Sequence, residues 1–494
     1  MLKKIRLTLA ILFFAAITLL FLDFTGSIHA LFGWMAKIQF LPALLALNVG
    51  VIVALVVLTL VVGRIYCSVI CPLGVFQDII SWINSRRKNK HRRFNYSRAK
   101  NWLRYSVLGL FIIAMVAGFS SIAALIAPYS SYGRIVNNLF APIYGWVNNL
   151  LAYFAERADS YAFYQTEIWL KSLPTLIVAI ITFIIIVTLA WRNGRTYCNT
   201  ICPVGTILGF LSKYSLFKIR IDANKCRSCS LCSKQCKASC IDFKNHTIDY
   251  SRCVDCMNCI DSCEFGAISY GIAPKQEAKS QSKATDTARR SFIVSAIATA
   301  TAATLDAQEK TVDGGFAVIE DKKIPHRNTH LEPPGALSLK HFAQHCTACQ
   351  LCVSVCPNGV LRPSTDLSRF MQPEMSFERG YCRPECNKCS QVCPTEAIVP
   401  VTVAEKSAIH IGHAVWIRKN CIPIVDGQEC GNCARHCPTG AIMMIPSDSN
   451  NPESLKIPII NEERCIGCGA CENLCPARPF SAIYIEGHNV HHEQ

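Results

Sequence analysis

The sequence lacks the signatures of most redox cofactors and of nucleotides. It contains no C-x-x-C-H motif to attach a c-type haem, no G-x-G-x-x-G motif after a strand, and no P-loop. We therefore expect neither haem nor flavin. Cysteine is abundant instead, at 29 of 494 residues. A secreted disulfide framework could explain that number, but most of these cysteines stand in tight C-x2-C-x2-C-x3-C runs, which hold metal.

Acidic residues are also scarce. Asp and Glu number 34 against 50 Lys and Arg, for a net charge of +16. Such an excess could indicate nucleic-acid binding, so its distribution matters more than its sum. Ten basic residues fall between Arg64 and Arg104, in a block between two apolar stretches. A positive loop in that position marks the cytoplasmic side of a membrane, so we expect a membrane protein and no nucleic-acid partner.

Four apolar runs approach the ~20 residues that a helix needs to cross the hydrocarbon of a bilayer. With 51% apolar residues and a positive mean hydropathy, the chain is too apolar for an ordinary soluble protein. The charge bias places the second and fourth runs so that both end on the cytoplasmic face. The segment 137–160 is expected to be amphipathic surface structure outside. The predicted membrane helices cover residues 7–24, 40–62, 103–127 and 173–191.

The ends of the second and fourth runs carry the same motif. Residues 63–74 and 194–205 agree at eight of twelve positions, including Gly-Arg, the C-x3-C-P core and a final Gly. This identity indicates a duplicated two-helix unit, which places the paired cysteines of both copies at one membrane face. The four thiols could bind a metal, cycle as disulfides or pack beneath a quinone site. They are Cys67, Cys71, Cys198 and Cys202.

A compact cysteine-rich module follows at residues 224–270. In two-cluster ferredoxins, the fourth Cys of each run crosses over to the other [4Fe–4S] cube, so Cys263 should complete the first cube and Cys236 the second. Lys237 replaces the usual Pro after Cys236, and Cys240 stands nearby, so either thiol could be the ligand; the regular spacing favours Cys236. The two runs are Cys226, Cys229, Cys232, Cys236 and Cys253, Cys256, Cys259, Cys263.

Four more runs follow in the C-terminal part, and Pro follows the last Cys of each. Zinc ribbons would need only pairs of C-x2-C and do not explain a third and fourth Cys with a trailing Pro. Crossover could join neighbouring runs, or the first with the fourth and the second with the third. The runs are Cys346, Cys349, Cys352, Cys356; Cys382, Cys386, Cys389, Cys393; Cys421, Cys430, Cys433, Cys437; and Cys465, Cys468, Cys471, Cys475.

A twin-arginine motif separates the two cysteine-rich parts. Arg289 and Arg290, followed by a short apolar run to Leu305, resemble an export signal placed in mid-chain. The alternative is a basic linker before a marginal fifth helix. The predicted topology leaves the chain cytoplasmic before Arg289, so the next segment should lead outward. The four C-terminal runs would then be extracytoplasmic, with a bilayer of ~30 Å between them and the first two.

The expected fold is a membrane α-helical bundle of four helices, with a fifth short anchor as an option, plus α+β ferredoxin-like modules. Together these would hold six [4Fe–4S] clusters. The expected domains are 1–212, the membrane domain; 213–273, a cytoplasmic two-cluster domain; 274–288, a linker; 289–307, a signal or anchor; and 308–494, an extracytoplasmic four-cluster domain.

These motifs resemble a known pair of proteins. Residues 1–272 resemble NapH, the membrane ferredoxin of periplasmic nitrate reduction systems, with four helices, two C-x3-C-P motifs and two clusters. Residues 281–494 resemble the NapG/MauM type, a twin-arginine-exported ferredoxin with four clusters. The chain looks like a fusion of the two. The resemblance also favours pairing the first C-terminal run with the fourth.

The resemblance implies a quinol dehydrogenase component, or electron-transfer subunit, of the bacterial inner membrane. It would pass electrons from menaquinol to a periplasmic redox protein or reductase, with its C-terminal domain in the periplasm. No catalytic residue is assigned, although Asp23 or His29 could accept protons if they are more than loop residues. The alternative is copper reduction or assembly of a respiratory oxidase or reductase, as in related membrane polyferredoxins, which the four membrane-face thiols would suit.

Overall fold

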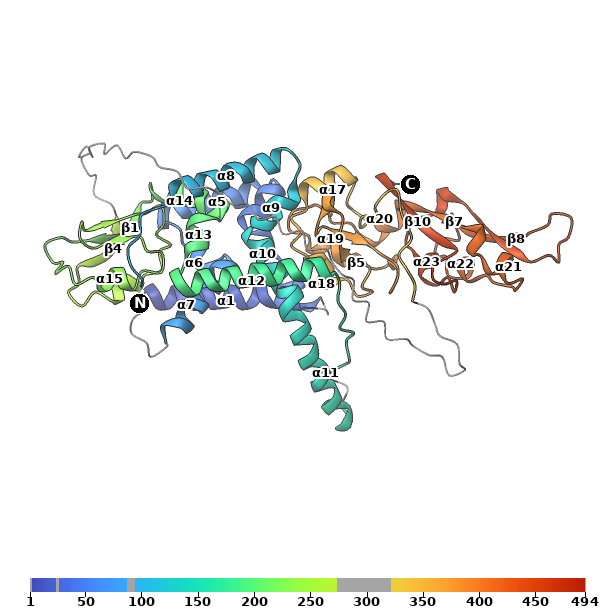
Figure 1. The fold of residues 1–494 in the computed structure, drawn as a ribbon, viewed down its shortest axis with the longest axis horizontal. Coiled ribbons are helices and arrows are strands. Elements are labelled where there is room, and N and C mark those ends of the chain that lie inside the picture. Colours follow the sequence, from blue (N-terminus) through green and yellow to red (C-terminus); the bar gives the residue numbers. More distant parts are fainter. Residues whose placement is uncertain (1, 24–25, 87–93, 161, 273–320, 494) are drawn as a thin grey trace, which may run out of the picture.

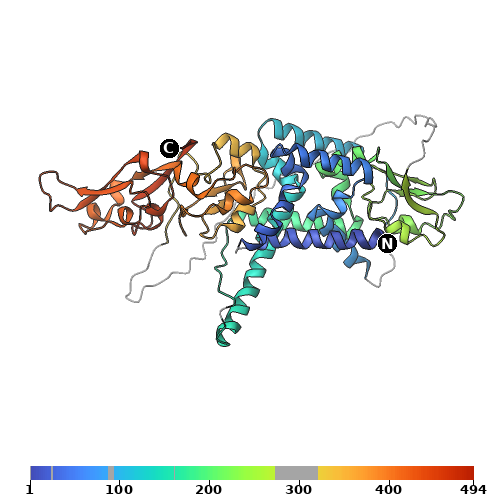
Figure 2. The same cartoon turned by 180° about the vertical axis from the view of Figure 1, so that it is seen from behind.

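A helical region occupies the middle of the computed structural model, with a cysteine-rich module at each end (Figure 1, Figure 2). The N-terminus lies beside the first module, and Lys3 pairs there with Asp261 at 2.9 Å. The predicted linker 274–288 and the twin-arginine segment 289–307 lie outside the described residues. The structure describes residues 2–23, 26–86, 94–160, 162–272 and 321–493.

Two helices are long and apolar enough to cross a membrane in the described part of the chain, α1 (Leu2–Leu22) and α12 (Leu173–Asn193). At ~1.5 Å per residue, 21 residues reach about 31 Å, close to the ~30 Å of bilayer hydrocarbon. The second and third predicted spans are each divided into two shorter helices. These are α4 (Phe40–Leu45) with α5 (Val49–Val62), and α8 (Asn101–Val116) with α9 (Ser120–Ile126). The four-helix membrane bundle therefore stays a prediction.

Local backbone geometry explains both interruptions. Leu47 has a positive φ of 50°, and Asn48 then caps α5 by accepting a hydrogen bond from the Val51 N–H at 3.2 Å. Gly118, with a φ of 81°, ends α8 in the left-handed conformation that favours glycine. Neither break is visible in hydropathy, because the flanking residues are apolar on both sides.

The predicted amphipathic segment 137–160 is helical and projects sideways from the helical region at the end nearer the C-terminal module (Figure 1). The π-helical turn η1 (Val136–Phe140) leads into α11 (Ala141–Arg157). Trp146 is 66% exposed and Phe154 58% exposed, so α11 presents large apolar side chains on its surface.

The duplicated motif forms two matching helix pairs. Cys71 and Cys202 are the N-cap residues of α7 (Pro72–Ser85) and α14 (Pro203–Ser212), and proline starts each helix, where its missing N–H is tolerated. The preceding short helices are α6 (Tyr66–Val69) and α13 (Thr196–Thr200). The other helices of this region are α2 (Ser27–Phe32), α3 (Trp34–Lys37) and α10 (Pro128–Ile135).

The first cysteine-rich module has an antiparallel pair, β1 (Phe217–Ile221) with β4 (Ile268–Ile272), and a second pair, β2 (Ile241–Asp242) with β3 (Thr247–Ile248). The short helices α15 (Leu231–Lys234) and α16 (Asn258–Asp261) carry cysteines of the two runs. Ser228, Ser230, Asp255 and Met257 have positive φ, which lets the chain turn tightly between successive cysteines.

The C-terminal module has three two-stranded antiparallel sheets. The strands are β5 (Leu361–Pro363) with β6 (Pro373–Met375), β7 (Ile409–Trp416) with β10 (Ile483–Glu493), and β8 (Ile442–Pro446) with β9 (Lys456–Ile460). Its helices are α17 (Leu339–His345), α18 (Leu351–Val355), α19 (Lys388–Val392), α20 (Val403–Ala408), α21 (Ile422–Val425), α22 (Asn432–Arg435) and α23 (Ala470–Asn473). Single turns of 3-10 helix are η2 (Leu367–Arg369), η3 (Arg418–Asn420) and η4 (Glu462–Arg464).

Both modules are hydrogen-bonded directly to the helical region. On the first module, the Tyr270 hydroxyl donates to the Val62 carbonyl at 2.9 Å. On the C-terminal module, Gln350 accepts hydrogen bonds from the Asn137 and Asn138 amides at 3.2 and 2.9 Å. The helical region therefore joins two cysteine-rich modules at its opposite ends.

Candidate iron–sulfur sites

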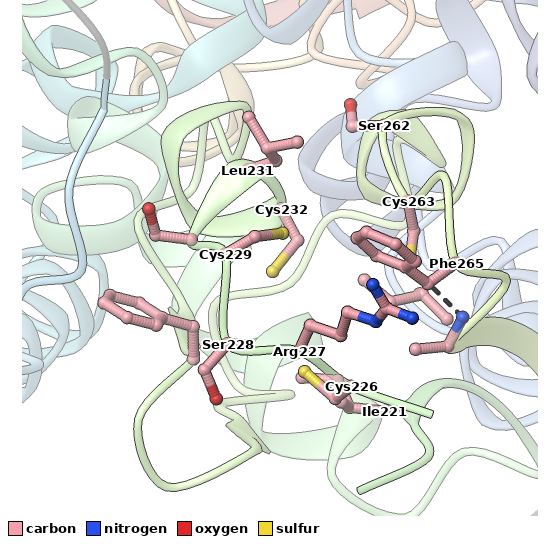
Figure 3. A pocket seen from close by; sticks show the side chains of 14 residues that line it. Ile221, Cys226, Arg227, Ser228, Cys229, Leu231, Cys232, Ser262, Cys263 and Phe265 are labelled. Carbon is pink, nitrogen blue, oxygen red and sulfur yellow. Dashed lines mark hydrogen bonds between the residues drawn. The ribbon is translucent and has the colours of Figure 1, made fainter. Parts of the chain in front are cut away.

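The first module folds its cysteines around two cavities. The first has about 370 Å³ of space free of atoms, lined by Cys226, Cys229, Cys232 and Cys263 (Figure 3). Three of these thiols come from one run and the fourth from the next, which is the arrangement that crossover requires. The Cys263 sulfur accepts the Ala267 N–H at 3.2 Å.

The second cavity, of about 320 Å³, leaves the choice between Cys236 and Cys240 open. Cys253, Cys256 and Cys259 line it together with both candidates. The sulfurs of Cys236 and Cys240 are 3.5 Å apart. Both are buried, so Cys236 remains a prediction based on spacing.

In the C-terminal module, neighbouring runs share cavities. Cys356 lines a cavity of about 400 Å³ with Cys382, Cys386 and Cys389. The predicted preference for joining the first run with the fourth is therefore wrong. Helix α18 packs against α19 and brings the first two runs together. The predicted pairing rested on the family resemblance alone. The spacing of the cysteines within a run does not determine which other run it pairs with.

The third and fourth runs are paired in the same way. Cys437 joins Cys465, Cys468 and Cys471 around about 270 Å³, and α22 packs against α23. Two further groups of four cysteines are identified by the electrostatic interactions between their thiols and by their contacts in the buried core. They are Cys346, Cys349, Cys352 with Cys393, and Cys421, Cys430, Cys433 with Cys475.

The cysteine groups fit the chemistry of an iron–sulfur cube. Each brings at least four thiols, enough for one on each iron, and in four of the six groups these thiols line a common pocket. Peptide N–H groups donate to the sulfurs of Cys437 and Cys475 at 3.2 and 3.3 Å, a type of contact that tunes cluster potential. Among the described residues, no three His, Cys, Asp or Glu side chains converge on a site for a single metal ion.

Two lysines, half-buried Lys322 and buried Lys406, place positive charge against the cysteine loops of the C-terminal module. Lys322 donates to the Glu472 and Cys475 carbonyls at 2.6 and 3.0 Å, and burial lowers its pKa to about 8. Lys406 donates to the Arg383 carbonyl at 2.5 Å and also to the Cys386 carbonyl. Nearby cations favour the more negative, reduced form of a bound cluster. These lysines carry no motif, so sequence reasoning missed them.

Comparison with known proteins identifies the families that the cysteine-rich segments match. Residues 345–397 and 428–478, and separately 249–360, match families described as a 4Fe-4S dicluster domain. Residues 44–91 and 175–222 match one described as a 4Fe-4S binding domain. MauM of Methylobacillus flagellatus, a methylamine utilization ferredoxin-type protein, is 32% identical over 33% of this chain and 70% of its own length. This chain belongs to the ferredoxin-type family. The matched domains show that it binds several [4Fe–4S] clusters.

Other relatives of this ferredoxin-type chain are also described as ferredoxin-type or electron transport proteins. The ferredoxin-type protein NapF of Escherichia coli is 30% identical over 32% of this chain and 87% of NapF. The putative electron transport protein YccM of the same species is 25% identical over 45% of this chain. The chain spans about half the length of YccM, at 55%, and a third of another relative. No solved structure matches it.

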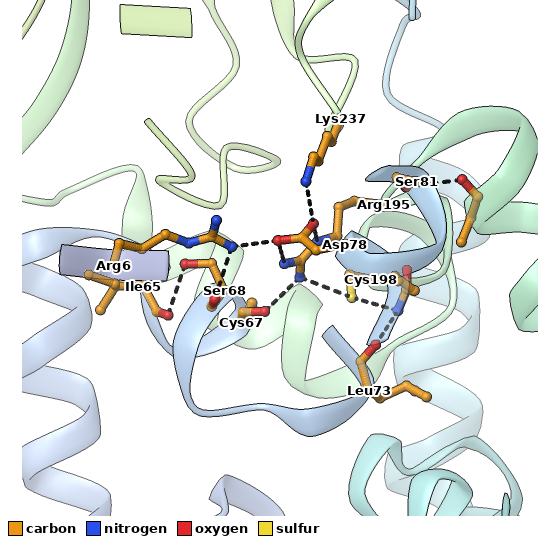
Figure 4. Close-up of polar contacts among 12 residues, drawn as sticks. Arg6, Ile65, Cys67, Ser68, Leu73, Asp78, Ser81, Arg195, Cys198 and Lys237 are labelled. Carbon is orange, nitrogen blue, oxygen red and sulfur yellow. Dashed lines mark hydrogen bonds and ion pairs between the residues drawn. The ribbon is translucent and has the colours of Figure 1, made fainter. Parts of the chain in front are cut away.

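The structure gathers the four thiols of the duplicated motif inside the helical region. Cys67, Cys71, Cys198 and Cys202 are all buried, and each lies within electrostatic range of the other three. Figure 4 shows two of them beside the guanidinium of Arg195. In the sequence, the Gly-Arg dipeptide that recurs in both copies of the repeat is the feature that could have predicted this arrangement.

Asp23 and His29 form a pair at the far end of α1. His29 Nδ1 lies 3.1 Å from Asp23 Oδ2, and that carboxylate also accepts the backbone N–H groups of Gly26 and Ile28, both at 2.9 Å. Lys388 of the C-terminal module lies within electrostatic range of His29. The contact between Asp23 and His29 could not be predicted from their separation of six residues in the sequence.

Proposed function

We propose that the chain carries electrons from a membrane quinol, menaquinol by resemblance, to a redox protein outside the bacterial inner membrane. The 24 cysteines of the six groups would hold six [4Fe–4S] clusters, two in the first module and four in the C-terminal module. The helical region would span the membrane, with the first module inside and the C-terminal module outside. Its position between two modules at opposite ends supports this orientation (Figure 1).

The observation that carries the proposal is the Asp23–His29 pair. It lies where α1 meets the C-terminal module, since a side chain at Gly26 would contact the Lys388 side chain at 3.5 Å. Lys388 lines the cavity of Cys356, Cys382, Cys386 and Cys389. A proton acceptor therefore stands beside a cluster site and at the end of an apolar helix, as quinol oxidation requires.

The pair is arranged to accept a proton. Asp23 orients the ring by accepting from Nδ1, which leaves Nε2 as the acceptor. His29 Nε2 is buried and has no hydrogen-bond partner among the described residues. A quinol hydroxyl could occupy that position. Oxidation to quinone releases two electrons and two protons; each proton would pass through His29 Nε2 to the outside. The clusters, when bound, accept and pass on single electrons.

The test is the reduction of the purified protein by a menaquinol analogue under anaerobic conditions. Loss of a general base slows proton transfer by about 10² to 10⁴-fold, so His29→Gln should slow cluster bleaching by that order. Iron content and reduction by dithionite should not change. His326→Gln, at an exposed histidine of the C-terminal module, is the matched control. Wild-type bleaching rates in His29→Gln would overturn the proposal.

Copper reduction is a second candidate, because soft thiolates favour Cu(I) and four thiols gather in the helical region. The same assay distinguishes the two functions. Copper handling predicts that the clusters stay oxidised with the quinol analogue while the purified protein binds copper through Cys67, Cys71, Cys198 and Cys202. Rapid bleaching by the analogue without copper binding would exclude it.

A further inference from the structure

The two copies of the duplicated motif complete each other. Arg64 of the first copy donates to the Cys198 carbonyl of the second at 3.3 Å, and Arg195 donates to the Cys67 carbonyl of the first at 2.6 Å. Both arginines are fully buried. Each arginine thus contacts the first cysteine of the other copy, and the two halves form a single centre.

The last glycine of each copy makes this close approach possible. A Cβ atom at Gly74 would lie under 3.0 Å from both the Cys67 carbonyl and an Arg195 nitrogen. One at Gly205 would meet the Cys198 carbonyl equally closely and an Arg64 nitrogen at 3.0 Å. The repeated P-x-G ending is therefore explained by the paired centre, since the same contacts recur in both copies.

Several donors point at the sulfurs. Gln77 Nε2 donates to Cys198 Sγ and the Gly205 N–H to Cys202 Sγ, both at 3.3 Å, while Arg64 Nη2 lies 3.7 Å from Cys67 Sγ. The cysteines of the two end modules accept similar N–H contacts, as at Cys263, at 3.2 Å. Donors of this kind stabilise a thiolate bound to metal.

The buried positive charge around the four thiols of the duplicated motif requires additional negative charge to balance it. Three cations, Arg6, Arg195 and Lys237, share the single carboxylate of Asp78 (Figure 4). Asp255 accepts only the backbone N–H of Arg64, at 2.8 Å. Arg64 forms no ion pair with a carboxylate among the described residues, and its electrostatic partners include the sulfurs of Cys67, Cys198 and Cys202. A buried guanidinium is costly unless a negative charge compensates it. Thiolates around an iron–sulfur cube supply that charge.

We propose that Cys67, Cys71, Cys198 and Cys202 together bind one additional [4Fe–4S] cluster, to which each copy contributes two thiolates. The segments 44–91 and 175–222 match a 4Fe-4S binding domain, yet each contains only two cysteines. Two thiolates are half of what a cube needs, and the structure supplies the other half from the second copy.

The position of this centre joins the clusters at the two ends of the molecule. Toward the first module, Lys237 follows Cys236 and pairs with Asp78 at 3.5 Å, and Asp78 contacts Arg195 at 2.8 Å. Toward the C-terminal module, buried Arg134 interacts electrostatically with both Tyr197, next to Cys198, and Cys349. A cluster bound here would accept one electron from either side and pass it on, without transfer of atoms.

Iron and acid-labile sulfide counts of the anaerobically purified full chain test the proposal without any quinol. Because each cube holds four irons, seven clusters give about 28 irons and six give about 24. The double variant Cys67→Ser/Cys198→Ser should lose about four irons and four sulfides relative to the wild type and keep the rest. Val69→Ala, which shortens a buried side chain between Cys67 and Cys71, should lose none.

A second measurement covers the case in which the double variant folds poorly. Mössbauer spectra of the wild type should contain the signal of the extra cube. Denaturing thiol titration of the wild type after iron removal, under anaerobic conditions without reductant, should find all 29 cysteines as free thiols. About 24 irons in the wild type, an unchanged count in the double variant, or a disulfide or copper at the four thiols would each overturn the proposal.

Discussion

Gly133 allows the helical region to contact the C-terminal module, and its replacement should separate them. Gly133 lies in α10, where an added Cβ would stand 2.5 Å from the Cys349 carbonyl and 2.7 Å from a ring carbon of Phe21. To restore an ordinary contact of 3.4 Å, the Cys349 loop must move by about 0.9 Å. Because Cys349 is a predicted cluster ligand, that movement should also disturb the cluster group of Cys346, Cys349, Cys352 and Cys393.

The expected cost of Gly133→Ala is about 1–3 kcal/mol, which is typical of overpacking a well-packed core. At about 2–4 °C per kcal/mol for a domain of 150–250 residues, the apparent melting temperature of the C-terminal module should fall by several degrees. Hydrogen exchange of residues 346–352 should accelerate. Gly109→Ala in α8 is the matched control, because nothing lies within 4 Å of its added Cβ.

Alanine at Gly109 should be neutral or stabilise α8 by up to about 1 kcal/mol, through helix propensity alone. If Gly133→Ala melts and exchanges like Gly109→Ala, the contact between α10 and the Cys349 loop does not exist in the protein, and the reasoning is refuted.

Two further predictions concern buried charge and ligand choice. Asp78→Asn leaves Arg6 and Arg195 without their shared carboxylate, so it should destabilise the protein by about 3–5 kcal/mol in thermal unfolding, while Asp321→Asn at an exposed position should change nothing. If Asp78→Asn melts like the wild type, the buried ion network contributes no stability. Cys236→Ser should lose about four irons per chain and Cys240→Ser none; iron loss in the Cys240 variant alone would make Cys240 the ligand.

The cysteine runs could be located from sequence because their chemistry is local. In four of the six runs, three thiols of one cube lie within seven residues, so spacing alone identifies them, as at Cys226, Cys229 and Cys232. The partner of each run could not be identified in this way. Crossover depends on which short helices pack together, and the packing of α18 on α19 is a tertiary contact.

The helical region was harder to predict for a related reason. Hydropathy detects apolar length but not the positive φ of Leu47 or Gly118, where two expected spans are interrupted. The duplicated motif was visible, yet its arginines gained a role only when the structure placed Arg64 on Cys198 and Arg195 on Cys67. Contacts between residues that are 128 and 134 positions apart in the sequence cannot be deduced from the spacing of neighbouring residues.

The sideways projection of α11 has an electrical consequence. A helix that exposes large apolar side chains such as Trp146 and Phe154 is suited to lie in the plane of a membrane surface, which would set the long axis of the molecule along the membrane normal. Electron movement between the two end modules would then cross the membrane voltage, worth about 2.3 kcal/mol per charge for each 100 mV. With the inside negative, that voltage would drive electrons outward, from the first module to the C-terminal one, and would oppose the filling of the inner clusters from quinol oxidised at His29.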